Sequence, residues 1–139
     1  MKESVFTLEI RKSLASLEGM YVRKIVAAMG MSNAGIPDIL GCYRSKFFAI
    51  ECKCIKLPKR AETEVFGYIF TEGQIINLNQ IKDAGGKAIG LIYIDDIRRC
   101  IFWDWRMHHI KKNYFIKKIE QEAFHYSYIN AYFQKLFID

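Results

Sequence analysis

Two apolar segments on either side of a short turn constrain the fold of this chain most. Residues 36–43 and 47–55 are rich in Ile, Phe, Cys and other apolar side chains, a composition that favours buried β-strands. The turn between them is centred on Arg44 and Ser45, and so short a connection can join antiparallel strands but not parallel ones. We therefore expect a β-hairpin that turns between these two residues.

The register of this hairpin would bring three charged side chains together. Pairing about its centre places Asp38 opposite Glu51, and opposed residues of antiparallel strands have Cβ atoms about 4.5–5.5 Å apart. Alternation along the second strand puts Lys53 on the same face as Glu51. Charges withdrawn from water cost several kcal/mol unless they are paired, so the pattern indicates either a neutralised core network or a ligand site.

Two neighbouring carboxylates raise the pKa of one of them unless a cation lies between them. A hard divalent ion such as Mg²⁺, or Mn²⁺, would resolve the repulsion, since Mg²⁺ is bound through one or two carboxylates, water and phosphate oxygens. An adjacent lysine can orient or help to deprotonate a metal-bound water, or stabilise charge on a phosphate. These groups suit phosphodiester hydrolysis. The alternative is a Lys–Glu pair beside a solvated Asp at a sheet edge.

The rest of the sequence predicts a mixed α/β chain. Apolar residues recur at helical spacing over residues 3–18, and a second helix would open with the capping-box pair Thr71 and Gln74 and end at Gly85-Gly86. The other expected elements are a strand over 21–29, a loop over 31–35, a mobile loop over 57–68, strands over 87–94 and 100–105, and a C-terminal helix over 120–137. The order α-β-β-β-α-β-β-α predicts an α+β fold, with helices flanking a mixed sheet.

The length of 139 residues predicts one domain over 1–139, with a core over about 3–105 and a C-terminal helical extension over 106–139. Lys and Arg number 21 against 15 Asp and Glu, a basic balance that favours a polyanionic partner. Charges interrupt the N-terminal segment, unlike a signal peptide, and no apolar run approaches the ~20 residues that cross a bilayer. We expect a cytoplasmic protein, in the host-cell cytoplasm if it is viral.

The segments GIPD (35–38) and FFAIECK (47–53) resemble the PD-(D/E)xK nuclease signature. They are most similar to the virus-type replication-repair (VRR-NUC) nucleases and to archaeal and phage Holliday junction resolvases. The resemblance covers about two thirds of the chain, residues 3–94, and it implies a restriction-endonuclease-like core. By this resemblance Asp38 and Glu51 would bind Mg²⁺ or Mn²⁺, Cys52 would offer its backbone carbonyl to the metal, and Lys53 would be the catalytic lysine.

The resemblance also implies a glutamate on the first helix and a glutamine at the start of the next one. Glu3 is favoured because it shares the apolar stripe of its helix, while Glu9 and Glu18 remain alternatives. A solvated Glu3 that supports the helix dipole would look the same in sequence. Gln74 matches the glutamine, and its alternative role is the capping box alone.

Basic residues on either side of the signature are candidate phosphate contacts: Arg23, Lys24, Lys56, Lys59 and Arg60. A later basic cluster is interleaved with aromatic residues that suit base stacking or, alternatively, belong to the core: Trp103, Trp105, Tyr114 and Phe115. The aromatic C-terminal helix would pack on the core or form a dimer interface. The resolvase resemblance implies a homodimer, because a four-way junction needs two cuts.

These features and the resemblance together predict a Mg²⁺-dependent endodeoxyribonuclease, for example a phage enzyme. Its substrate would be branched DNA formed in recombination or repair. One alternative is the same chemistry on a flap, a nick or a restriction site. A second is a DNA-binding subunit without catalysis, and a third is a small regulatory protein with a structural Lys–Glu pair.

Overall fold

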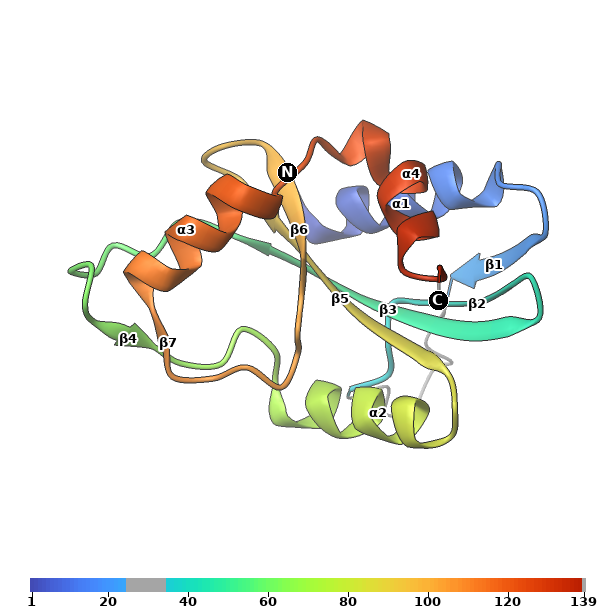
Figure 1. The fold of residues 1–139 in the computed structure, drawn as a ribbon, viewed down its shortest axis with the longest axis horizontal. Coiled ribbons are helices and arrows are strands. Elements are labelled where there is room, and N and C mark those ends of the chain that lie inside the picture. The colour runs from blue at the N-terminus through green and yellow to red at the C-terminus, as the bar shows by residue number, and fades with distance from the viewer. Residues whose placement is uncertain (25–34, 139) are drawn as a thin grey trace.

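A five-stranded mixed sheet organises the computed structural model, which describes residues 1–24 and 35–138 (Figure 1). Its strands lie in the order β1 (Met20–Lys24), β2 (Ile39–Tyr43), β3 (Lys46–Ile55), β5 (Lys87–Ile94) and β6 (Arg99–Trp103). The central strands β3 and β5 are parallel, and every other adjacent pair is antiparallel. The mixed sheet and its helices match the α+β fold expected from the sequence.

Helices cover both faces of the sheet. Helix α1 (Glu3–Ala15) and helix α4 (Ile129–Lys135) lie on one face, and α2 (Glu72–Asp83) lies on the other (Figure 1). Helix α3 (Lys112–Glu122) follows a small ribbon made by β4 (Val65–Phe66) and β7 (Ile110–Lys111). No helix in the described ranges is long and apolar enough to cross a membrane.

Strand alternation sorts the apolar residues into two cores. Phe48 and Ile50 of β3 pack with Phe6 and Ile10 of α1 beneath α4. The core on the opposite face joins α2 and α3 to the sheet through residues such as Leu78, Ile92, Trp103 and Phe115. Because successive strand residues point to opposite faces, β5 contributes to both cores.

The predicted hairpin register is confirmed. β2 pairs with β3 so that Cys42 lies opposite Phe47 and Tyr43 opposite Lys46. The two turn residues have positive φ angles, 47° at Arg44 and 68° at Ser45, which is the backbone conformation of a type I′ two-residue turn. The observed strands start at Ile39 and Lys46 rather than at 36 and 47.

The helix over 71–86 also ends as predicted, whereas the first helix stops earlier than expected. α2 carries the complete capping box at Thr71 and Gln74 and closes before Gly85. α1 ends at Ala15 instead of residue 18, and β6 ends at Trp103 instead of 105. The strand predicted over 21–29 is present as far as Lys24; its remainder, and residues 31–34 of the predicted loop, lie outside the described residues.

The single C-terminal helix predicted over 120–137 is wrong. Helix α3 closes at Glu122, and Phe124 then forms a β-bridge with Cys100, in which each backbone N–H donates to the other's carbonyl. A 3₁₀ turn at Tyr126–Tyr128 leads into α4. The chain leaves the helical path because Phe124, 4% exposed, pairs with the edge of β6 and enters the core.

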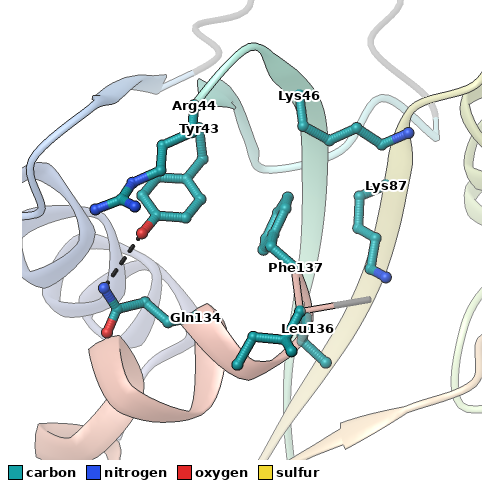
Figure 2. A pocket seen from close by; sticks show the side chains of 8 residues that line it. Tyr43, Arg44, Lys46, Lys87, Gln134, Leu136 and Phe137 are labelled. Carbon is teal, nitrogen blue, oxygen red and sulfur yellow. Dashed lines mark hydrogen bonds between the residues drawn. The ribbon is translucent and has the colours of Figure 1, made fainter.

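The end of the chain packs on the body of the protein beside the hairpin turn (Figure 2). Gln134 of α4 donates a hydrogen bond of 3.2 Å to the Tyr43 hydroxyl, and Phe133 and Phe137 meet the Tyr43 ring edge-on. A cavity of about 610 Å³ opens here, and three cations border it: Arg44, Lys46 and Lys87. The C-terminal aromatic residues therefore belong largely to the core.

Candidate metal centre

Three carboxylates converge at the point where β2 begins and β3 continues without a partner strand on that side. Glu3, Asp38 and Glu51 each offer one oxygen, and these three atoms lie within 4.8 Å of one another. Glu3 opens α1, Asp38 directly precedes β2, and Glu51 lies within β3. No other group of acidic, His and Cys side chains in the described ranges is arranged to hold a metal ion in this way.

The carboxylates of Asp38 and Glu3 occupy the place that an adjacent strand would take. β2 starts only at Ile39, so the last residues of β3 have no partner on that side. The backbone N–H of Cys52 donates to Asp38 Oδ2 at 2.8 Å, and that of Cys54 donates to Glu3 Oε2 at 3.4 Å. The predicted cross-strand pairing of Asp38 with Glu51 is thus replaced by a contact between a side chain and the backbone, which still brings the two carboxylates together.

Gln74 ties the third carboxylate to helix α2. Its Oε1 accepts from the Thr71 N–H at 2.9 Å, and its Nε2 donates to Glu51 Oε1 at 2.7 Å. The Thr71 N–H can only donate, so it fixes which end of the amide faces Glu51. The two roles considered for Gln74 are therefore compatible, because one side chain completes the capping box and orients Glu51.

A close backbone approach sets the distance between the GIPD segment and α2. Gly35 has φ +84°, and a Cβ built there would lie 2.4 Å from the carbonyl oxygen of Gly73. Only glycine fits a positive φ with so little space. Gly35 thereby lets the chain leading to Asp38 rest on the first turn of the helix that carries Gln74.

Burial and mutual repulsion both disfavour the charged forms of the carboxylates in this cluster. Glu51 is only 2% exposed, and burial, followed by the nearby charge of Asp38, raises its pKa to about 8, against a smaller opposing effect of Lys53. Burial also raises the pKa of Asp38, although the Cys52 N–H and Lys53 favour its charged form. Helices α1 and α2 both begin here, and helix N-termini favour negative charge.

The residues fit a hard divalent cation. Glu51 Oε2 is buried and has no hydrogen-bond partner among the described residues, a cost of about 1–3 kcal/mol for an ordinary polar group. Lys53 is half-buried and forms no ion pair within 4.0 Å in the described part of the chain. A carboxylate oxygen without a partner, beside two further carboxylates, is the oxygen-rich environment that Mg²⁺ and Mn²⁺ favour.

The other predicted residues lie at varying distances from this centre. Glu9 and Glu18 are outside the cluster. Lys24 is exposed and borders the same cleft as Asp38, while Arg23 stacks its guanidinium 4.2 Å from the Tyr21 ring centroid. The remaining phosphate candidates are exposed in the segment that follows β3: Lys56, Lys59 and Arg60.

The aromatic residues of the later basic cluster belong mostly to the core. Trp103, Trp105 and Phe115 are at most 7% exposed, so the interpretation as core residues holds for them, whereas Tyr114 is 41% exposed. Arg11 was not among the predicted residues, although it also borders the cleft beside Asp38. Its only sequence signal is its place eight residues after Glu3 on the same helix.

Comparison with solved structures supports the fold. The chain matches the structure of Hjc, a Holliday junction resolvase from the archaeal hyperthermophile Archaeoglobus fulgidus, with a TM-score of 0.51 and 15% identity, over 91% of this chain and 95% of that one. No protein-family model and no curated protein matches the sequence. At this identity the likeness shows a shared restriction-endonuclease-like fold, the fold that the sequence signature implied.

Proposed function

We propose that the protein is a divalent-metal-dependent endodeoxyribonuclease of the PD-(D/E)xK type. The observation that carries the proposal is the cluster of Glu3, Asp38 and Glu51, whose oxygens lie within 4.8 Å of one another. The likeness of the fold to a Holliday junction resolvase supports it. The narrower resemblance to VRR-NUC or phage enzymes remains a prediction from the sequence alone.

Asp38 and Glu51 would hold the ion, with Glu3 beside them. The N–H of Cys52 points at Asp38, and because the N–H and C=O of one strand residue face the same neighbour, its carbonyl is suitably directed to be a further ligand. A bound Mg²⁺ or Mn²⁺ would supply an acidified water and would neutralise charge on the phosphate. Gln74 fixes Glu51 in position.

Lys53 would act on the reacting phosphate itself. It lies on the same face of β3 as Glu51, two residues further along the strand, and is half-buried. Its ammonium would stabilise the charge that develops on the phosphate oxygens, a contribution that grows when water is excluded. The same amine would also orient the attacking water.

The substrate we propose is branched DNA, because the structure with the similar fold is a Holliday junction resolvase. The active form we propose is a homodimer, because a four-way junction needs two cuts. Five exposed cations would contact the phosphate backbone of the DNA: Arg23, Lys24, Lys56, Lys59 and Arg60. Binding dominated by phosphate contacts weakens steeply as salt is added.

Cleavage of a matched set of linear, nicked, flap and four-way DNA, with and without Mg²⁺, tests this function. We expect the wild type to cut the four-way junction only with the metal, and both Asp38→Asn and Lys53→Met to lose at least about a thousandfold in rate while they still bind DNA. Glu9→Gln, on α1 but outside the cluster, is the matched control and should cut normally. Binding of DNA without any cleavage by the wild type would instead indicate a subunit without catalysis.

A further inference from the structure

A cleft of about 480 Å³ lies between α1 and the chain that leads into β2. The carboxylates of Glu3 and Asp38 form one part of its wall, and Arg11 and Lys24 form another. The cleft is therefore lined by two of the three carboxylates of the candidate metal centre and by two cations from different elements.

Three of the residues that line the cleft form a single row along helix α1. Glu3, Thr7 and Arg11 are spaced by four residues, and residues at i, i+4 and i+8 lie on the same side of a helix. Thr7 is only 9% exposed, so it fills the helix surface between the two charged side chains. Arg11 is thus held at a fixed offset from the carboxylate cluster along a rigid element.

Arg11 is the unsatisfied cation of this row. Its Nε is buried without a hydrogen-bond partner among the described residues, and its guanidinium forms no ion pair with them. The sequence between residues 25 and 34 contains no Asp or Glu that might pair with it. A buried guanidinium N–H without an acceptor is costly, and the described residues supply no acceptor for it.

We propose that Arg11, assisted by Lys24, binds the phosphate that neighbours the scissile phosphate on the DNA strand to be cut. This inference rests on the proposed function, because it assumes that the scissile phosphate lies at the carboxylate cluster. The planar fork of arginine binds phosphate oxygens in pairs, which lysine does not. Arg11 is then a positioning residue that sets which phosphate reaches the metal centre.

Binding of a four-way DNA junction without divalent metal tests the contact directly. We expect Arg11→Gln to weaken binding about tenfold and to reduce the slope of log affinity against log salt by about one. Arg11→Lys should keep the slope and regain only part of the affinity. Lys12→Gln removes an exposed charge from the same helix outside the cleft, and it should change affinity less than twofold.

A methylphosphonate scan around the cut site identifies the phosphate. Neutralising the phosphate next to the cut should weaken wild-type binding by a similar factor and leave Arg11→Gln binding unchanged, since that variant has already lost the contact. Equal sensitivity of both proteins at every position would overturn the inference, as would an Arg11→Gln variant that folds and binds like the wild type. The wild-type scan alone does not assign the contact to Arg11, so Arg11→Lys, which keeps the charge, is scanned as a second variant if Arg11→Gln folds poorly.

The two proposals fail in different ways. If the wild type cuts the junction in Mg²⁺ but the scan and the salt slope are unaffected by Arg11→Gln, the nuclease stands and the Arg11 contact is wrong. If the wild type never cuts but Arg11→Gln still loses affinity and salt slope, the contact with DNA phosphate stands and the proposed catalysis is wrong.

Discussion

The two faces of strand β3 differ in what they contribute to the protein. The even-numbered residues Phe48, Ile50 and Cys52 have no exposed surface and pack into the core beneath α1 and α4. On the opposite face Glu51 is nearly as buried, yet it lies among carboxylates and retains an oxygen without a partner. One face of the strand therefore stabilises the fold, and the other is maintained at a cost in stability.

This difference teaches how the site can be recognised. Apolar burial needs no ligand to be favourable, whereas clustered carboxylates become favourable only when a cation or a proton joins them. Strain of this kind is expected at functional sites. Substitutions on the two faces should accordingly change stability in opposite directions.

The largest expected change in stability comes from the apolar face. Ile50→Ala should lower the free energy of unfolding by about 2–5 kcal/mol, because it removes buried methyl groups and leaves a cavity. Chemical denaturation measures the loss, and Ile50→Val, with one methyl fewer, should cost about 0.5–1.5 kcal/mol. A negligible loss for Ile50→Ala would show that this face is not the stabilising one.

Removing charge from the acidic face should have the opposite sign. Glu51→Gln should raise the free energy of unfolding at pH 8, measured without divalent metal, by at least about 1 kcal/mol. It removes a buried charge and keeps an oxygen that can accept from Gln74. Destabilisation of the metal-free protein by this substitution at pH 8 would contradict the comparison.

The pH dependence sharpens the same point. The folded protein keeps the Glu51 proton up to about pH 8, whereas the unfolded chain releases it near the ordinary value of 4.5. Because the folded state then binds more protons, the contribution of Glu51 to the free energy of unfolding falls between these pH values, by at most about 1.4 kcal/mol per unit. The raised pKa of Asp38 acts in the same direction. Denaturation of the wild type and Glu51→Gln from pH 5 to 8 should show a gap that widens with pH.

The smallest stability effect is expected at Gln74, which joins helix α2 to the site. Gln74→Ala loses the contact with Glu51 and half of the capping box, which should cost about 1 kcal/mol. Orienting partners of metal ligands typically contribute about 10–100-fold in metal affinity, so calorimetry with Mn²⁺ should detect a larger effect than denaturation does. Gln80→Ala, exposed on the same helix, should change neither quantity appreciably.

The parts of the fold that local sequence determines were predictable. The hairpin centre at Arg44-Ser45 fixed the register, and the Thr71–Gln74 box and Gly85 fixed the ends of α2. The break between α3 and α4 was not predictable in this way, because it depends on Phe124 pairing with Cys100, 24 residues earlier. Helical periodicity carries no information about such a contact.

The candidate site shows the same division between local and distant contacts. Strand alternation and register brought Asp38, Glu51 and Lys53 into consideration, and the apolar stripe favoured Glu3 over Glu9. Two hydrogen bonds fix these side chains. The bond from Cys54 to Glu3 spans 51 positions of the sequence, and the bond from Gln74 to Glu51 spans 23 positions. Arg11 lies beyond the nuclease signature, and only the cleft itself revealed it.

Titration of the protein with Mn²⁺ at pH 8, followed by calorimetry, measures most directly whether the carboxylate cluster is a metal centre. We predict that the wild type binds the ion with release of a proton, that Glu51→Gln binds it at least about tenfold more weakly, and that Glu9→Gln binds it like the wild type. Absence of binding by the wild type at millimolar Mn²⁺, or equal binding by wild type and Glu51→Gln, would contradict the account.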